Sequence, residues 1–179
     1  MEMLGAAGLE VFNYESPPED DQLGTPVDHL SRLGDGLESI FGTQSPEQLA
    51  SWGRLVTEQD LEQDRNAGAE RRALRILRGP KRVAAVLRGF TRRLDQVRGE
   101  PLHNWKQLDS EQFWVVVYSN PLLNGRPRTE KACHFWTAAL EARLRWAGLA
   151  NEWTVTELEC GAVIAGSDCV FAVKHARSY

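Results

Sequence analysis

The chain has 179 residues, of which 42% are hydrophobic, so it is long enough for one domain with a substantial core. It contains no apolar run of roughly 18 residues, and its first residues lack the basic-then-apolar pattern of a signal peptide. Only three cysteines are present, which argues against a disulfide framework and favours reduced thiols or a metal site. We therefore expect a cytoplasmic protein without a membrane span.

Charge is distributed unevenly along the chain, although the formal net charge is only -4. Residues 1–64 contain 14 acidic and 2 basic side chains, whereas residues 65–98 contain 11 basic and 2 acidic ones. Arginine-rich helices bind phosphate groups, so residues 65–98 raise nucleic-acid binding as an alternative function. The overall pI near 5.6 and the acidic first segment argue against it. We expect both segments to be solvated helix faces, with the basic helix 81–98 and the acidic first 64 residues as contact surfaces for a protein partner.

The first part of the chain is predicted to be an acidic arm followed by helices. Residues 1–24 include two prolines and an acidic cluster, and we expect them to form a flexible arm. Over residues 25–100, apolar side chains recur at helical spacing between proline and glycine breaks. Four helices are expected there, beginning at Thr25–Pro26, at Ser45–Pro46, near Thr57–Asp60 and at Pro80.

Residues 101–179 are predicted to add strands and to form one compact domain with residues 25–100. The run FWVVVYS over 113–119 is β-branched and aromatic, which favours a strand. A turn-rich loop, a helix over 129–148 and a hairpin of strands 153–159 and 169–175 follow. Because helices and strands segregate along the chain, the predicted class is α+β, with an antiparallel sheet covered by helices and a helical N-terminal half.

All three cysteines fall in the last third of the chain, together with a glutamate, in the pattern C-x23-E-x2-C-x8-C. Closure of the hairpin brings Cys160 near Cys169, and Cys133 joins them if its helix packs over that hairpin. Zinc accepts thiolate and carboxylate ligands, so Glu157 is a candidate fourth ligand. Glu157 and Cys160 point to opposite faces of a regular strand, so both can bind one ion only if the strand bulges or ends near Leu158. Glu159 therefore competes with Glu157.

The same segment resembles the 4-vinyl reductase domain. The features that carry the resemblance are a helix beginning near Cys133, a strand ending Glu157-Leu158-Glu159-Cys160, a loop with Gly166, and Cys169-Val170-Phe171 in the last strand. A hydrophobic strand running into Asn120-Pro121 precedes them, and the resemblance covers about residues 112–175. The family belongs to a wider group that includes haem-based nitric oxide sensors and Golgi vesicle-tethering subunits.

The resemblance implies a zinc ion held by Cys133, Glu157, Cys160 and Cys169. Four protein ligands leave no open position for water, so such a zinc would be structural. The phenol-sensing members of the family bind an aromatic effector near the zinc, which implies a small hydrophobic or aromatic ligand here. The family is named after a reductase of bacteriochlorophyll synthesis, so an enzyme or accessory factor in tetrapyrrole vinyl reduction is an alternative. His134, beside Cys133, is another candidate metal ligand.

Aromatic side chains in the second half are candidates for an apolar ligand pocket, with His103 and Asn104 as possible polar contacts. The pocket residues that we expect are Trp105, Trp114, Tyr118 and Trp136. The sequence contains no phosphate loop, no nucleophile elbow and no H-E-x-x-H motif, so catalysis is not indicated. We expect a sensory or regulatory ligand-binding protein that acts through a partner or as a dimer.

Overall fold

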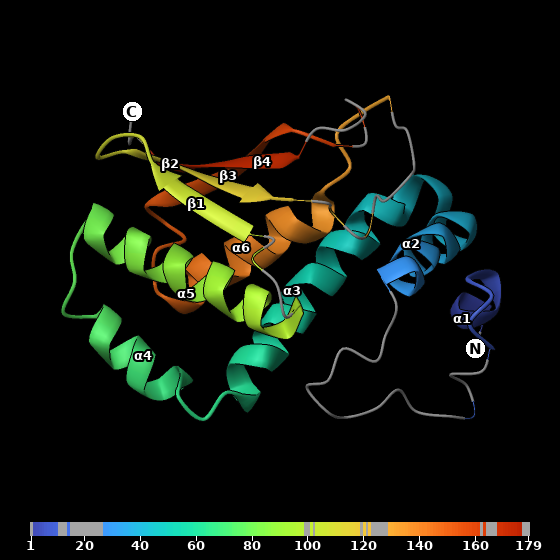
Figure 1. The fold of residues 1–179 in the computed structure, drawn as a ribbon, viewed down its shortest axis with the longest axis horizontal. Coiled ribbons are helices and arrows are strands. Elements are labelled where there is room, and N and C mark those ends of the chain that lie inside the picture. Colours follow the sequence, from blue (N-terminus) through green and yellow to red (C-terminus); the bar gives the residue numbers. More distant parts are fainter. Residues whose placement is uncertain are drawn as a thin grey trace.

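Figure 1 shows the computed structural model of the chain, which describes residues 2–10, 14, 27–98, 101, 103–118, 120, 122, 129–161, 163 and 168–176. Three features expected from the sequence lie outside these residues. They are the two prolines of the acidic arm, the helix start at Thr25–Pro26 and the loop glycine Gly166.

The described residues form helices first and mainly strands later, as the sequence predicts. The helices are α1 (Glu2–Ala6), α2 (Val27–Phe41), the short 3-10 helix η2 (Gly42–Gln44), α3 (Ser45–Gln63), α4 (Ala67–Leu74), α5 (Pro80–Arg98) and α6 (His134–Trp146). The strands are β1 (His103–Gln107), β2 (Gln112–Val117), β3 (Trp153–Glu159) and β4 (Cys169–His175). The α+β class, the antiparallel sheet and the helical N-terminal half are confirmed.

The four strands form one antiparallel sheet in the order β1-β2-β4-β3. Side chains alternate between its faces: Phe113, Val115 and Val117 of β2 are buried, whereas Trp114 between them is 37% exposed. In β4, Phe171 lies opposite Val115 and belongs to the same buried face. This face forms the core with α5 and α6, and the other face is open to solvent at Trp114.

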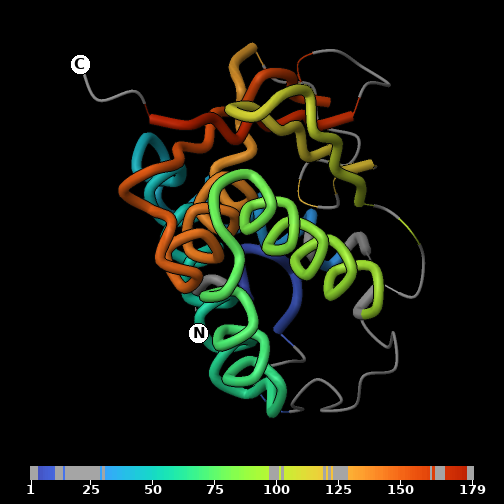
Figure 2. Tube along the Cα trace, turned by 90° about the vertical axis from the view of Figure 1, so that its left-hand side faces the viewer, coloured from blue at the N-terminus to red at the C-terminus, as the bar shows by residue number. Residues whose placement is uncertain are grey.

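The helices cover the buried face of the sheet in two layers. Figures 1 and 2 show α5 and α6 directly against the sheet, with α3 packed on the far side of α6. Helix α5 begins at Pro80 as predicted and buries Val83, Val86, Leu87 and Phe90 toward the core. Lys81, Arg88 and Arg92 are exposed on the rest of the helix, whereas Arg82 bonds to the carbonyl oxygen of Ala147.

The beginning of the expected flexible arm contains the short helix α1. Helix α1 packs against α2, and the residues that follow it bury Ala7 and Leu9. Arg32 of α2 donates hydrogen bonds to the carbonyl oxygens of Ala7 and Gly8, the first of them 2.9 Å long. Apolar burial and these two bonds hold the start of the arm on α2, although its sequence is acidic.

Helix α3 is longer than predicted and continues through the expected break near Thr57. The Thr57 hydroxyl donates to the carbonyl oxygen of Gly53 at 2.9 Å, which satisfies it within the helix instead of at a new N-cap. The helix ends at Gln63, and the Asp64 carboxylate accepts a bond from the amide of Asn66 in the turn before α4. The third expected helix is therefore the short α4.

One strand and the start of one helix also differ from the prediction. Strand β1 was not expected, because its sequence HNWKQ is polar and does not alternate clearly; pairing with β2 determines it. Helix α6 begins at His134 instead of near Thr129, because Lys131 and Cys133 are tied to Glu157 of β3. These bonds hold Lys131 and Cys133 against β3.

The contact between α3 and α6 requires a glycine at position 53. A Cβ atom at Gly53 would lie 2.1 Å from the carbonyl oxygen of Phe135, a backbone atom that cannot rotate away. Gly53→Ala should therefore lower the free energy of unfolding by about 2 kcal/mol, since the two helices must separate. Chemical denaturation measures this change.

Gly68→Ala is the matched control. Position 68 is exposed on α4, and the nearest atom to a Cβ there is a flexible arginine nitrogen at 3.8 Å. Alanine has the higher helix propensity, so the free energy of unfolding of this variant should rise by up to about 1 kcal/mol. Equal effects of the two substitutions would contradict close packing of α3 on α6.

Candidate functional site

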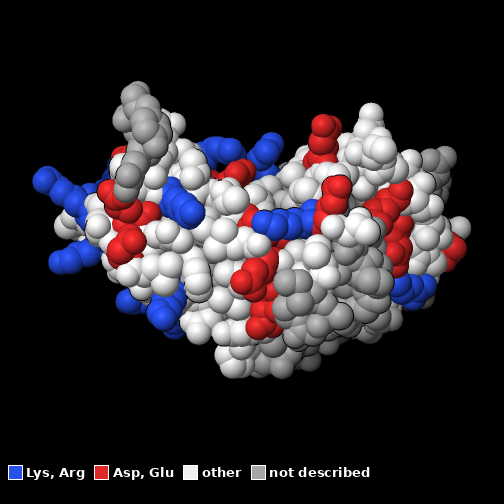
Figure 3. Space-filling view, turned by 90° about the horizontal axis from the view of Figure 1, so that it is seen from above, with Lys and Arg blue, Asp and Glu red and all other residues white. Residues whose placement is uncertain are grey.

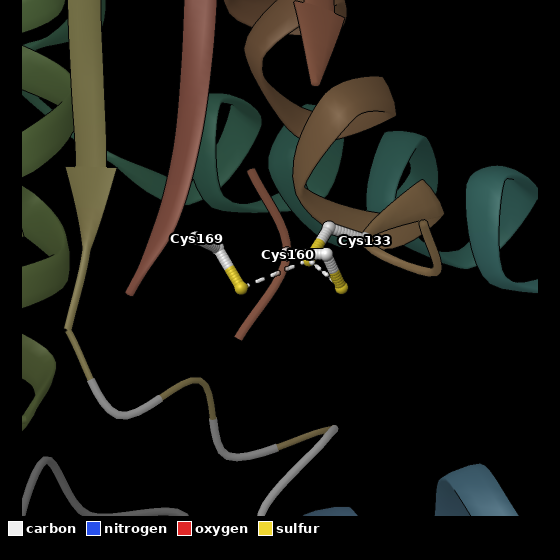
Figure 4. Close-up of side chains that lie close together, drawn as sticks. All are labelled: Cys133, Cys160 and Cys169. Atoms are coloured by element: carbon white, nitrogen blue, oxygen red, sulfur yellow. Dashed lines mark hydrogen bonds between the residues drawn. The ribbon is translucent and has the colours of Figure 1, made fainter. Parts of the chain in front are cut away.

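The structure brings the three cysteine side chains together at the junction of α6 and the β3–β4 hairpin (Figure 4). Cys133 is the N-cap residue of α6, Cys160 follows β3, and Cys169 begins β4. The Cys133 sulfur lies 3.0 Å from that of Cys169 and 3.7 Å from that of Cys160. All three thiols are free and buried.

A β-bulge in β3 turns Cys160 toward this cluster. Glu157 pairs with Phe171, and Glu159 pairs with the adjacent Val170, so the register shifts by one residue between them. This is the bulge near Leu158 that the sequence argument required. Because of the shift, Glu157 and Cys160 lie on the core side of the sheet, while Glu159 is exposed.

The carboxylate of Glu157 is hydrogen-bonded to the backbone of the cysteine cluster. Its Oε2 accepts a bond from the backbone amide of Cys133 at 3.1 Å. Its Oε1 is buried and has no hydrogen-bond partner among the described residues. The group of ligand atoms that lie within 4.8 Å of one another contains the three sulfurs alone, so coordination by Glu157 requires a rotation of its side chain.

Asn120 contacts the cluster and was not recognised as a site residue from the sequence. Its Nδ2 donates to the sulfurs of Cys133 and Cys169 at 3.4 and 3.5 Å. Its Oδ1 accepts bonds from the indole nitrogen of Trp136 at 3.0 Å and from the amide of Leu122 at 3.1 Å. The Asn-Pro pair after β2 was the available signal, but it was interpreted as a strand end.

The two closest thiols have opposite pKa shifts in the metal-free cluster. The hydrogen bond from Cys133, with further bonds from Gly161 and Asn120, lowers the pKa of Cys169 to about 7, although burial opposes it. The same hydrogen bond to Cys169 raises the pKa of Cys133, and burial and the nearby Glu157 carboxylate raise it further. One proton is therefore held between two sulfurs.

Three cysteine sulfurs and a carboxylate suit a structural zinc ion better than a catalytic one, which keeps an open coordination position. Tetrahedral zinc with Zn–S distances of about 2.3 Å separates its sulfur ligands by roughly 3.8 Å, close to the spacing of Cys133 and Cys160. A divalent cation would also neutralise the negative charge of the buried thiolates. His134, the other candidate ligand, lines a separate open groove of about 390 Å³ with Lys131 and Glu130.

The four aromatic residues expected to form a pocket lie apart. Trp136 is buried and lines a partly open cavity of about 200 Å³ between α3, α5 and α6. Trp105 packs against Phe113 on the sheet, and Trp114 lies on the opposite, solvent-facing side. Tyr118 follows β2 and is half-buried. These last three do not line the Trp136 cavity, which is formed by other described residues.

His103 is buried, and it contacts Trp136 without facing a cavity. Its Nδ1 and its backbone amide both bond to one carboxylate oxygen of Asp95, at 2.8 and 3.0 Å. Its ring centroid lies 5.4 Å from that of Trp136. These contacts connect β1 to α5 and α6. Asn104, the neighbouring candidate, is exposed and bonds to the amide of Trp105.

Exposed cations gather at the turn between α4 and α5. Figure 3 shows lysine and arginine side chains projecting from the left-hand edge of the molecule, where Figure 1 places this turn. The basic surface comprises Arg71, Arg72, Arg75, Arg78 and Lys81. Ile76, at its centre in the sequence, is 82% exposed. No described helix is both long enough and apolar enough to cross a membrane.

Comparison with known proteins gives a likeness of fold. No family model matches the chain, and no curated protein matches it. A solved structure described as "Probing the function of heme distortion in the H-NOX family" is similar, with a TM-score of 0.59 and 14% sequence identity. The match covers 99% of this chain and 85% of that one. At this identity, the two chains share a fold.

The cavity at Trp136 does not fit a haem. Haem iron takes an axial histidine, cysteine, methionine or tyrosine from the protein. None of these residue types lines this cavity, and its volume of about 200 Å³ is below the range of about 300–1,000 Å³ typical of ligand pockets. His103 is held by Asp95, and the cysteines contact one another.

The pKa shift of Cys169 predicts how the stability of the metal-free protein depends on pH. From about pH 7 to pH 9, Cys169 is a thiolate in the folded protein and a thiol in the unfolded chain, so stability rises with pH. Below pH 7 that contribution is lost. Above about pH 9 stability falls, because Cys133 keeps its proton only in the folded state. Denaturation of metal-free protein across this range measures the profile.

Cys169→Ser should remove the rise between pH 7 and pH 9. Thiolate absorbance in the ultraviolet should show one cysteine titrating near pH 7 in the parent protein and none in the variant. A parent protein whose three thiols all titrate near the ordinary value would contradict the hydrogen-bonded pair.

Proposed function

We propose that this protein is a small-molecule-binding sensory or regulatory protein of the 4-vinyl reductase type, with a structural zinc site. The zinc ligands are Cys133, Cys160, Cys169 and Glu157. Residues 25–179 form one compact domain, which carries both the metal site and the ligand site. The protein acts through a protein partner or as a dimer, with the basic surface and the acidic first 64 residues as contact regions.

The cysteine cluster carries this proposal. Three buried thiols from a helix start and two strand ends converge within 4.8 Å, although they are separated by up to 36 positions in the sequence. Disulfide formation can join only two of them. Glu157, the residue that the family resemblance assigns as the fourth ligand, accepts a bond from the amide of Cys133, and its buried Oε1 has no hydrogen-bond partner among the described residues.

Zinc bound here would act as a structural crosslink. Four protein ligands leave no position for a water or a substrate, so the metal would clamp the start of α6 to the β3–β4 hairpin. Cys133 would orient the start of α6, and Cys160 and Cys169 would fix the hairpin. Glu157 would bind the metal through one carboxylate oxygen and keep its hydrogen bond to the Cys133 amide through the other. None of these roles moves a proton or an electron.

The sensing part of the proposal rests on the fold. The similar H-NOX structure concerns haem, whereas this chain offers a cavity of about 200 Å³ and a cysteine cluster. A ligand-binding role with a different ligand therefore fits better than a haem protein. Vinyl reduction in tetrapyrrole metabolism remains the enzymatic alternative, and no described side-chain arrangement favours it.

Zinc analysis of paired glutamate variants tests the ligand set. The purified protein should contain about one zinc per chain. Glu157→Gln should weaken zinc binding by at least about tenfold in competition with a chelator, because a charged ligand is lost. Glu159→Gln is the matched control: the residue is two positions away and exposed, so the variant should bind zinc as the parent does.

The opposite ranking would assign the fourth ligand to Glu159. A folded protein that binds no zinc when its cysteines are reduced would contradict the metal site altogether. Cys160→Ser is the control for the metal site itself, since it should abolish tight zinc binding whichever glutamate is the fourth ligand.

A further inference from the structure

The two edge strands of the sheet are β1 and β3, because the strand order is β1-β2-β4-β3. Along an edge strand, every second residue directs its backbone N–H and C=O groups away from the sheet, where another strand can pair with them. Proteins usually block such an edge with side chains, loops or helices. The two edges of this sheet differ in how far they are blocked.

Side chains of the protein itself cap the edge at β1. The amide of Leu108 bonds to β2, and bonded positions alternate, so the odd-numbered residues of β1 direct their backbone groups outward. The outward amide of His103 donates to the Asp95 carboxylate at 3.0 Å. The outward amide of Trp105 donates to the side chain of Asn104 at 2.8 Å. A further strand therefore finds these two donors already occupied.

The outer edge of β3 is its side away from β4. Just before β3, the carbonyl oxygen of Glu152 accepts a bond from the amide of Ala176 at 2.7 Å. Because bonded positions alternate, the even-numbered residues of β3 bond to β4 and the odd-numbered ones direct their backbone groups outward. The residues with outward groups are Trp153, Val155 and Glu157.

Only two of these outward groups are bonded within the described part of the chain. The amide of Trp153 donates to the carbonyl oxygen of Leu149 at 3.0 Å, and the carbonyl oxygen of Glu157 accepts from Lys131 at 2.9 Å. The carbonyl of Trp153, both groups of Val155 and the amide of Glu157 form no such bond there. Of the described strands, β4 alone pairs with β3.

The unbonded groups complement those of a second copy of β3. In an antiparallel pair centred on Val155, each Val155 bonds to the other through both of its groups, and each Glu157 amide donates to the opposite Trp153 carbonyl. The Trp153 amide and the Glu157 carbonyl would also face each other, but both already have partners. A strand of another protein would bring a further N–H and C=O to these two positions, whereas a second copy leaves none over.

The side chains on the outer face of β3 also suit this pairing. Thr154 and Thr156 are exposed, and the register centred on Val155 places Thr154 of each copy opposite Thr156 of the other. Threonine favours strands, and threonine pairs across strands stabilise them. The sequence of β3, WTVTELE, has neither the lysine nor the proline that commonly prevents edge pairing.

We propose that β3 is a dimerisation strand, which pairs antiparallel with β3 of a second copy around Val155 and joins two four-stranded sheets into one. The same patch serves both copies, as a two-fold interface requires. The interface goes beyond the charged contact regions of the proposed function. It requires neither zinc nor a ligand, so its failure would leave those proposals unchanged.

Sedimentation equilibrium of two double variants tests the pairing. Thr154→Glu with Thr156→Glu sets like charges opposite each other across the interface, whereas Thr154→Glu with Thr156→Lys sets opposite charges there. The variants differ only at position 156, and in both the new glutamate lies opposite Lys174 of β4. The dimer of the first variant should have a dissociation constant at least about tenfold higher than that of the second.

Equal dissociation constants for the two folded variants would place the interface elsewhere and overturn the proposal. So would a Glu/Lys variant that is weakened as much as the Glu/Glu one, because its charges attract only in the antiparallel register. A parent protein that stays monomeric at its highest soluble concentration would overturn the proposal and leave the edge to a strand of another protein.

Hydrogen exchange of the parent protein tests the same interface without a substitution. Raising the concentration through the dimer transition should slow exchange of the Val155 and Glu157 amides by at least about tenfold. The amides of Thr154 and Thr156 bond to β4 in monomer and dimer alike, so they are the matched control and should not change. Dimers without added protection at Val155, or protection already complete in the dilute monomer, would overturn the proposal.

Discussion

One extra residue in β3 determines where the cysteines meet. Side chains of a strand alternate between faces, so Glu157 and Cys160 would lie on opposite sides of a regular strand. The bulge between Glu157 and Glu159 returns Cys160 to the core side, near Cys169 of the neighbouring strand. Glu157 then reaches the amide of Cys133 and fixes the residue at which α6 begins. A single backbone irregularity thus brings two strands and a helix to one point.

Burial makes the negatively charged form of the three thiols unfavourable, and hydrogen bonds compensate for this only in part. Asn120 and the amide of Gly161 donate to the sulfurs, and these bonds favour one thiolate. Cys133 responds in the opposite direction, since a second negative charge beside the first is unfavourable. A divalent cation would deprotonate all three thiols and remove this conflict, so metal binding and folding should be linked. Trp136 is connected to the same sulfurs through its hydrogen bond to Asn120.

The sequence predicted those parts of the molecule that depend on local pattern. Helix α5 follows from its apolar stripe after Pro80, and the cysteine convergence and the required bulge follow from strand alternation. Strand β1 could not be predicted, because its polar sequence becomes a strand only by pairing with β2. The role of Asn120 and the cavity at Trp136 depend on residues far apart in the chain, and neither periodicity nor spacing reports such contacts. The four residues expected to form an aromatic pocket lie apart for that reason, since composition could not tell which face of the sheet Trp114 occupies.

The central claim is that Cys133, Cys160, Cys169 and one carboxylate hold a zinc ion that joins α6 to the β3–β4 hairpin. X-ray absorption at the zinc edge on protein purified with its native metal tests this claim most directly. The account predicts three sulfur neighbours at about 2.3 Å and one oxygen neighbour at about 2.0–2.2 Å. A first shell with fewer than three sulfurs, or one made only of nitrogen and oxygen, would contradict it.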